Sequence, residues 1–207
     1  MADRITTIEE LRKLYRAPSV LVSQKKASIL GPETTARLRA SPFVLLATAG
    51  QDGTCDVSPR GGPPGMLAVL DERTVALPDL GGNNLIDSLS NIVQNPYAGL
   101  LVLTPGSDET VRVDGAAELR TDKAILDHWN GLFRRPKLAV VLTVDSVFIH
   151  CAKAFRRSHL WDPTTWIADA PDAAALLDEH LGGGLDLGAV RTSLDESYEV
   201  DLAEEQL

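Results

Sequence analysis

Short apolar runs alternate with turn-forming residues through the middle of the chain. The continuous apolar run at 43–49 predicts a buried strand, and the GQDG sequence at 50–53 predicts a hairpin turn after it. Six further runs have the β-branched residues and flanking turns typical of strands: 55–58, 66–70, 74–77, 97–104, 110–119 and 138–151. The strands between 43 and 77 follow one another too closely for crossover helices, which favours an antiparallel barrel or sandwich.

Helical spacing of apolar residues interrupts and flanks the strands. The predicted helices cover 6–15, 32–39, 83–94, 123–129 and 171–180, and an acidic helix covers about 194–207. The helix at 83–94 would place Leu85 and Ile86 on its apolar face. We therefore expect an N-terminal helical extension at 1–40, a barrel domain at 41–163 and a C-terminal helical segment at 164–207 that packs on the barrel or on a dimer interface.

Composition narrows the class of protein. Of the 207 residues 44% are hydrophobic and 24% charged, and the net charge is −9, which argues against a nucleic-acid binder. No apolar run approaches the length of a membrane span, and residues 1–4 lack the apolar core of a signal peptide. Cys55 and Cys151 lack CxxC spacing, so we expect them to be reduced thiols in a cytoplasmic protein with no membrane partner.

A glycine-rich turn lies between a predicted strand and a predicted helix. The sequence from 77 to 91 reads LPDLGGNNLIDSLSN, so a strand ends at Pro78 and two glycines and two asparagines follow. Free backbone N–H groups at such a turn bind anions, most often phosphate. Ordinary connections between strands and helices use the same residues, so the turn by itself leaves both interpretations open.

Other common catalytic motifs are missing from the sequence. No GxGxxG follows a strand, no GxSxG indicates a hydrolase, and the four histidines show no HExxH or other metal-ligand spacing. We therefore expect no metal site. A cofactor that carries the chemistry itself would need few acids or bases from the protein.

Several segments, in order and spacing, resemble one known family. They are SPF at 41–43, DVSPRG at 56–61, GNN at 82–84, VRVDG at 111–115 and KAFRRSHLW at 153–161. Together they cover roughly residues 40–163 and resemble the pyridoxamine 5′-phosphate oxidase-like, FMN-binding split-barrel proteins, in a branch of uncharacterised FMN-dependent enzymes. The resemblance implies a mainly β fold with flanking helices, a six-stranded antiparallel split barrel, a homodimer and FMN at the dimer interface.

The residue chemistry identifies nine candidate cofactor-binding residues. A planar guanidinium suits a phosphate, and amide and hydroxyl groups suit a ribityl chain. The candidates are Ser58, Arg60, Asn83, Asn84, Ser88, Asn91, Lys153, Arg157 and Trp161. Each has a structural alternative: an exposed loop arginine, a helix cap, a core contact, or a cation–π pair of Arg157 with Trp161.

Three positions depart from the family pattern. Leu85 stands where an arginine is usual, Gly62 where an acid is usual and Ser90 where a basic residue is common.

The candidate residues and the resemblance leave two classes of function open. One is an FMN-dependent oxidoreductase that exchanges two electrons or a hydride with a small organic substrate, a reduced nicotinamide or a deazaflavin. The other is a non-enzymatic split-barrel protein that binds flavin, haem or another cofactor.

Overall fold

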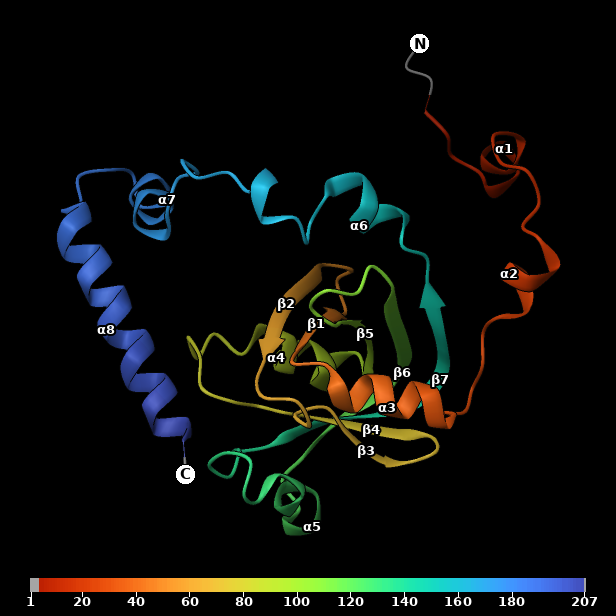
Figure 1. Ribbon diagram of the computed structural model, residues 1–207, viewed down its shortest axis with the longest axis horizontal. Coiled ribbons are helices and arrows are strands. Elements are labelled where there is room, and N and C mark those ends of the chain that lie inside the picture. Colours follow the sequence, from red (N-terminus) through yellow and green to blue (C-terminus); the bar gives the residue numbers. More distant parts are fainter. Residues whose placement is uncertain (1–3, 207) are drawn as a thin grey trace.

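The computed structural model describes residues 4–206 and contains one seven-stranded antiparallel sheet that curls into a split barrel (Figure 1). Its strand order is β2-β1-β5-β6-β7-β4-β3. The strands are β1 (Phe43–Ala49), β2 (Cys55–Gly61), β3 (Ala68–Asp71), β4 (Thr74–Pro78), β5 (Tyr97–Leu103), β6 (Thr110–Arg120) and β7 (Ala139–His150). The mainly β fold with flanking helices is confirmed, with seven strands instead of six. Residues 1–3 and 207, which include most of the segment checked for a signal peptide, lie outside the description.

Strand β2 forms one edge of the sheet and continues three residues further than its sequence predicts. Proline has no N–H to donate to a neighbouring strand, but at an edge that missing donor faces away from the sheet. Pro59 pairs with Leu45 of β1, and no strand of the described chain lies on the opposite side of β2. The extension carries Arg60 in extended backbone, so its side chain projects from a regular strand.

Strand β7 joins the two halves of the barrel. Its first half pairs with β4, and β6 pairs along its whole length with a register shift between Asp114 and Gly115. A Cβ atom on Gly115 would lie 1.9 Å from the Thr143 carbonyl oxygen. Only glycine therefore permits the close approach of the two backbones at this bend.

Helices close the barrel at several points. They include α3 (Pro32–Ala40), α4 (Asp87–Gln94), α5 (Lys123–Leu126) and the 3₁₀ turn Asp127–Trp129, whereas α1 (Ile8–Lys13) lies away from the barrel (Figure 1). Helix α1 begins at a capping box, in which Thr7 accepts from the Glu10 N–H and Glu10 accepts from the Thr7 N–H. Trp129 is 1% exposed, donates to the Met66 carbonyl and stacks on Phe133, which fills one end of the barrel.

Helix α4 begins at Asp87, four residues later than the apolar pattern predicts. Asn84 and Ile86 have φ values of 57° and 56°, in the left-handed region, and these values keep the chain out of helical geometry. Leu85 and Ile86 are consequently 64% and 60% exposed. The prediction that these two side chains belong to the buried face of the helix is wrong.

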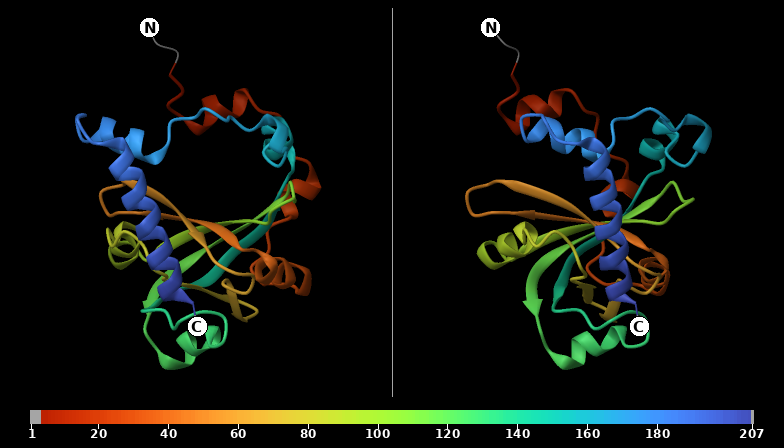
Figure 2. Two further views of the ribbon diagram at one scale, coloured as in Figure 1. Left: turned by 60° about the vertical axis from the view of Figure 1, so that its left-hand side comes forward. Right: turned by 90° about the vertical axis from the view of Figure 1, so that its left-hand side faces the viewer.

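The remaining helices lie outside the barrel. They are α2 (Val20–Gln24), which the sequence analysis did not predict, α6 (Lys153–Ser158), the 3₁₀ turn Pro163–Thr165, α7 (Ala173–His180) and α8 (Leu187–Glu205). Helices α6, α7 and α8 form an arc beside the barrel in both Figure 1 and Figure 2. No residue of α1, α2, α6 or α8 is buried. Between residues 4 and 206, no helix is both long and apolar enough to cross a membrane.

Candidate functional site

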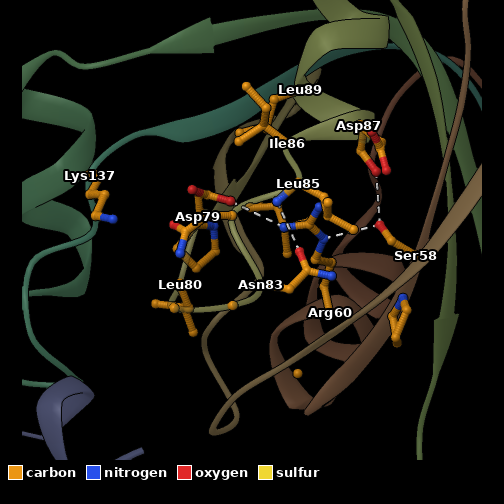
Figure 3. Close-up of a pocket in the computed structure, with 18 of the residues that line it drawn as sticks. Ser58, Arg60, Asp79, Leu80, Asn83, Leu85, Ile86, Asp87, Leu89 and Lys137 are labelled. Atoms are coloured by element: carbon orange, nitrogen blue, oxygen red, sulfur yellow. Dashed lines mark hydrogen bonds and ion pairs between the residues drawn. The ribbon is translucent and has the colours of Figure 1, made fainter. Parts of the chain in front are cut away.

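A pocket of about 380 Å³ lies beneath the glycine-rich turn (Figure 3). One wall is the edge strand β2, and a second is the end of β4 with the turn at 79–86. The start of α4 and the side chain of Lys137 complete the lining. From the sequence this turn could be either an anion site or an ordinary connection. The structure places Ser58, Arg60, Asn83, Asn84 and Ser88 around one cavity.

Arg60 lies at the centre of this pocket and is already paired. Its Nη1 donates to Asp79 Oδ1 at 3.1 Å, and its Nε donates to Ser58 Oγ at 3.2 Å. The two charged side chains are 23% and 19% exposed. Arg60 is therefore not an exposed loop arginine. Its side chain lies between strand β2 and the turn (Figure 3).

A chain of hydrogen bonds continues from Arg60 into the barrel. Ser58 Oγ lies 3.0 Å from Ser88 Oγ, and Ser88 donates its hydroxyl proton to the Asp56 carboxylate. Since Ser88 uses its one proton on Asp56, Ser58 is the donor between the two hydroxyls. Ser88 is 3% exposed. The chain thus runs from a guanidinium to a carboxylate and fixes β2 against α4.

The two asparagines of the turn are exposed, and one of them shapes it. Asn83 Oδ1 accepts from the Leu85 N–H at 3.1 Å, a short-range bond that stabilises the turn. Its Nδ2 amide remains a donor toward the pocket (Figure 3). Asn84 adopts the left-handed conformation that asparagine tolerates well. Leu85 lines the same pocket.

The structure places the other four predicted site residues outside this pocket. Asn91 Nδ2 donates to Thr48 Oγ1 at 3.1 Å and links α4 to β1. Lys153 and Arg157 are exposed on α6. Trp161 stacks on Phe155, with ring centroids 5.6 Å apart, and its indole donates to the Ser107 carbonyl. The cation–π contacts found in the described chain involve Phe148 and not Trp161.

The sequence analysis missed the acidic side of the pocket. Asp56, Asp79 and Asp87 contribute three carboxylates, against the two cations Arg60 and Lys137. Asp56 lies two residues before Ser58, on the same face of β2, and this spacing was a readable signal. Lys137 follows Arg134, Arg135 and Pro136, a basic run that was also visible. Among residues 4–206, no three histidine, cysteine, aspartate or glutamate side chains are placed so that they could hold one metal ion.

A comparison with known protein families shows to which family the chain belongs. Residues 30–151, more than half of the 207, match the family described as pyridoxamine 5′-phosphate oxidase. The matched range includes all seven strands and the pocket. The chain therefore belongs to the pyridoxamine 5′-phosphate oxidase-like split-barrel family. No curated protein sequence matches it.

Solved structures with a similar arrangement are distant in sequence. A putative pyridoxamine 5′-phosphate oxidase from Lactobacillus delbrueckii is 25% identical, with 60% of this chain and 99% of that chain covered and a TM-score of 0.47. HupZ of Group A Streptococcus is 17% identical, covers 57% and 93% of the two chains and has a TM-score of 0.47. The FAD-binding protein from Mycobacterium smegmatis is 18% identical, covers 60% and 97% and has a TM-score of 0.40.

Proposed function

We propose that this protein binds FMN in the pocket beneath the glycine-rich turn and acts as an FMN-dependent oxidoreductase. The observation that carries the proposal is Arg60, held on β2 of a split barrel of this family and facing the turn across the pocket. Bound FMN would supply two-electron or hydride transfer. The substrate would be a small organic molecule, and a reduced nicotinamide or deazaflavin could supply electrons.

The volume of the pocket and the chemical groups that line it both fit such a cofactor. The pocket volume of about 380 Å³ falls in the range of about 300–1,000 Å³ usual for small-ligand sites. Arg60 offers a guanidinium, Asn83 an amide, and the turn its backbone N–H groups, which are the donors that phosphate and hydroxyl oxygens require. The described lining contains no histidine, cysteine or tyrosine, the side chains that most often ligate haem iron.

We also propose that the working form is a homodimer. Lys153, Arg157 and Trp161 lie outside the pocket of their own chain, so a site that uses them with Arg60 requires a second copy. The outer segments at 1–40 and 164–207 carry exposed apolar side chains, among them Leu21, Ile167 and Leu181 at 81%, 81% and 69%. Unpartnered apolar surface of this kind favours an interface. Light scattering at micromolar concentration should give the mass of two chains, and a monomer would contradict the dimer.

An absorption spectrum and a flavin titration test the cofactor. Flavin bands in the purified protein, or saturable quenching of added FMN fluorescence, are expected. Arg60→Ala should weaken FMN binding by about tenfold or more, because a lost charge-assisted hydrogen bond costs about 1.5–3 kcal/mol. Arg73→Ala, on the exposed turn between β3 and β4, is the matched control and should bind as the parent does. A Soret band, or equal affinities in the two variants, would contradict the assignment.

A further inference from the structure

The glycine-rich turn already holds an oxyanion that belongs to the protein itself. The Gly81 N–H donates to Glu205 Oε1 at 2.6 Å, and these residues are 124 positions apart in the sequence. A Cβ atom on Gly81 would lie 2.9 Å from that same oxygen, so glycine is what allows the carboxylate to come this close. Carboxylate and phosphate oxygens use the same backbone donors. Glu205 therefore occupies a place that suits a phosphate oxygen.

Helix α8 reaches the barrel only through its last turn. Every residue from 195 to 204 is exposed, whereas Glu205 is half-buried. Besides the Gly81 bond, the Glu205 carbonyl accepts from the Arg134 N–H at 2.7 Å. At its other end α8 is tied to α7 by the ion pair of Arg191 with Asp172. Two hydrogen bonds thus dock the end of the helix, and no buried apolar side chain of α8 reinforces them.

A second pocket, of about 390 Å³, lies where Glu205 docks. It shares Lys137 and much of the glycine-rich turn with the first pocket, so the two cavities adjoin. Its charged lining consists of three cations and four acids, three of the acids from α8: Arg134, Arg135, Lys137, Asp79, Asp201, Glu204 and Glu205. Within residues 4–206 none of these cations forms an ion pair, in contrast to Arg60, whose charge Asp79 already compensates.

Charge matching therefore favours the second pocket for the dianionic end of the cofactor. The first pocket has two cations and three carboxylates. With the end of α8 displaced, the second would keep three cations without an ion pair among the described residues and one carboxylate, Asp79, which is paired with Arg60. Displacing that helix end would leave a basic pocket beside free backbone donors.

Resting on the proposed function, we propose that Arg134, Arg135, Lys137 and the Gly81 N–H form the phosphate subsite of the flavin site, and that the Glu205 carboxylate occupies it until phosphate displaces it. FMN and the docked end of α8 then exclude one another. Riboflavin, which has no phosphate, is indifferent to Glu205. The subsite thus has a resident competitor in the same chain.

Glu205→Gln tests the competition. The amide keeps the size of the side chain and loses its charge, so FMN should bind about threefold to tenfold more tightly, while riboflavin affinity stays at the parent value. Glu204→Gln is the matched control, since Glu204 lines the same pocket without bonding Gly81, and it should change FMN affinity less than about twofold. Arg134→Ala with Lys137→Ala should weaken FMN about tenfold and spare riboflavin. Unchanged FMN affinity in Glu205→Gln, or equal shifts for FMN and riboflavin, would overturn the proposal.

A second measurement separates this proposal from the cofactor assignment. Hydrogen exchange of the full chain would follow the amides at 195–205 with inorganic pyrophosphate and with sodium chloride at matched ionic strength. Pyrophosphate should speed exchange at the end of α8. Gly81→Ala should do the same without ligand, because its methyl group displaces the carboxylate, whereas Gly82→Ala, with no atom within 4 Å of its Cβ, should not. If no flavin binds, the proposed function fails and this readout still decides the subsite: exchange unmoved by pyrophosphate and by Gly81→Ala would overturn it.

Discussion

Arg60 on strand β2 donates a hydrogen bond to Asp79, the residue that follows β4, and their charged atoms lie 3.1 Å apart. The pair joins the edge strand to the segment after β4, and it compensates the cation that faces the turn. Access of an anion to Arg60 therefore depends on how strongly Asp79 holds it.

Asp79→Asn should release Arg60 for an oxygen atom of bound FMN. The amide retains a hydrogen-bond acceptor but no charge, so FMN affinity should rise about threefold and the gain should shrink as salt is added. Asp87→Asn is the matched control. It also removes a carboxylate from this pocket, but Asp87 forms no ion pair in the described chain. Flavin fluorescence titrations of both variants measure the difference, and equal gains would show that general charge, and not release of Arg60, is responsible.

Leu85→Arg should add a cation at the mouth of the pocket. Leu85 is 64% exposed, so the guanidinium can stay solvated and the melting temperature should remain close to that of the parent. FMN should bind more tightly at low salt, with the gain diminishing as ionic strength rises. Leu89→Arg, at a site only 8% exposed, is the contrasting variant and should destabilise the fold. An exposed arginine at 85 with no effect on FMN affinity would show that this position does not face the bound flavin.

Gly115→Ala should be severely destabilising. The added methyl group would lie 1.9 Å from the Thr143 carbonyl oxygen, and backbone must move to accommodate it. We expect a loss of more than about 3 kcal/mol in the free energy of unfolding, measured by urea denaturation. Gly61→Ala is the matched change in an edge strand, where the nearest atom is 3.8 Å away, and it should cost less than about 1 kcal/mol. Similar losses for the two would refute the close-approach argument.

His150 should contribute to a loss of stability in mild acid. Burial lowers the pKa of its imidazole below the ordinary 6.5, nearby Lys25 and Arg112 lower it further, and Asp114 opposes them. The unfolded chain therefore takes up this proton at a higher pH than the folded chain does, so stability falls as pH drops through 6.5 and below. His150→Gln should flatten the pH dependence of the unfolding free energy between about pH 7 and 5. His180→Gln, on exposed helix α7, is the control, and an unaltered slope in His150→Gln would contradict the prediction.

Local patterns determined how well the sequence predicted the fold. The apolar run at 43–49 coincides with β1, and α1 lies within the helix predicted at 6–15. The start of α4 was misplaced because periodicity cannot reveal that Asn84 and Ile86 adopt left-handed backbone. The end of β2 was missed because Pro59 signals a break unless the strand lies at an edge, which is a property of the whole sheet.

The candidate site likewise contains residues that local sequence predicts and residues that it does not. Arg60 and the Asn83–Asn84 turn follow from adjacent residues, and the structure brings them to one pocket. The compensating Asp79 lies 19 residues from Arg60, and Glu205 lies 124 residues from Gly81. Such contacts depend on how separate elements meet, and no spacing within either segment indicates them.

The attachment of Glu205 at the end of α8 also has a consequence for ligand selection. A carboxylate tethered to its own binding site acts at a high effective concentration, on the order of millimolar for a short flexible linkage. Inorganic phosphate, which gains only the subsite contacts, must compete against that internal concentration. A phosphorylated ligand that also fills the adjoining pocket makes further contacts, and these help it to displace Glu205. The tether thus raises the concentration of a bare anion such as pyrophosphate that is needed to open the subsite, and it favours a phosphate carried by a larger molecule.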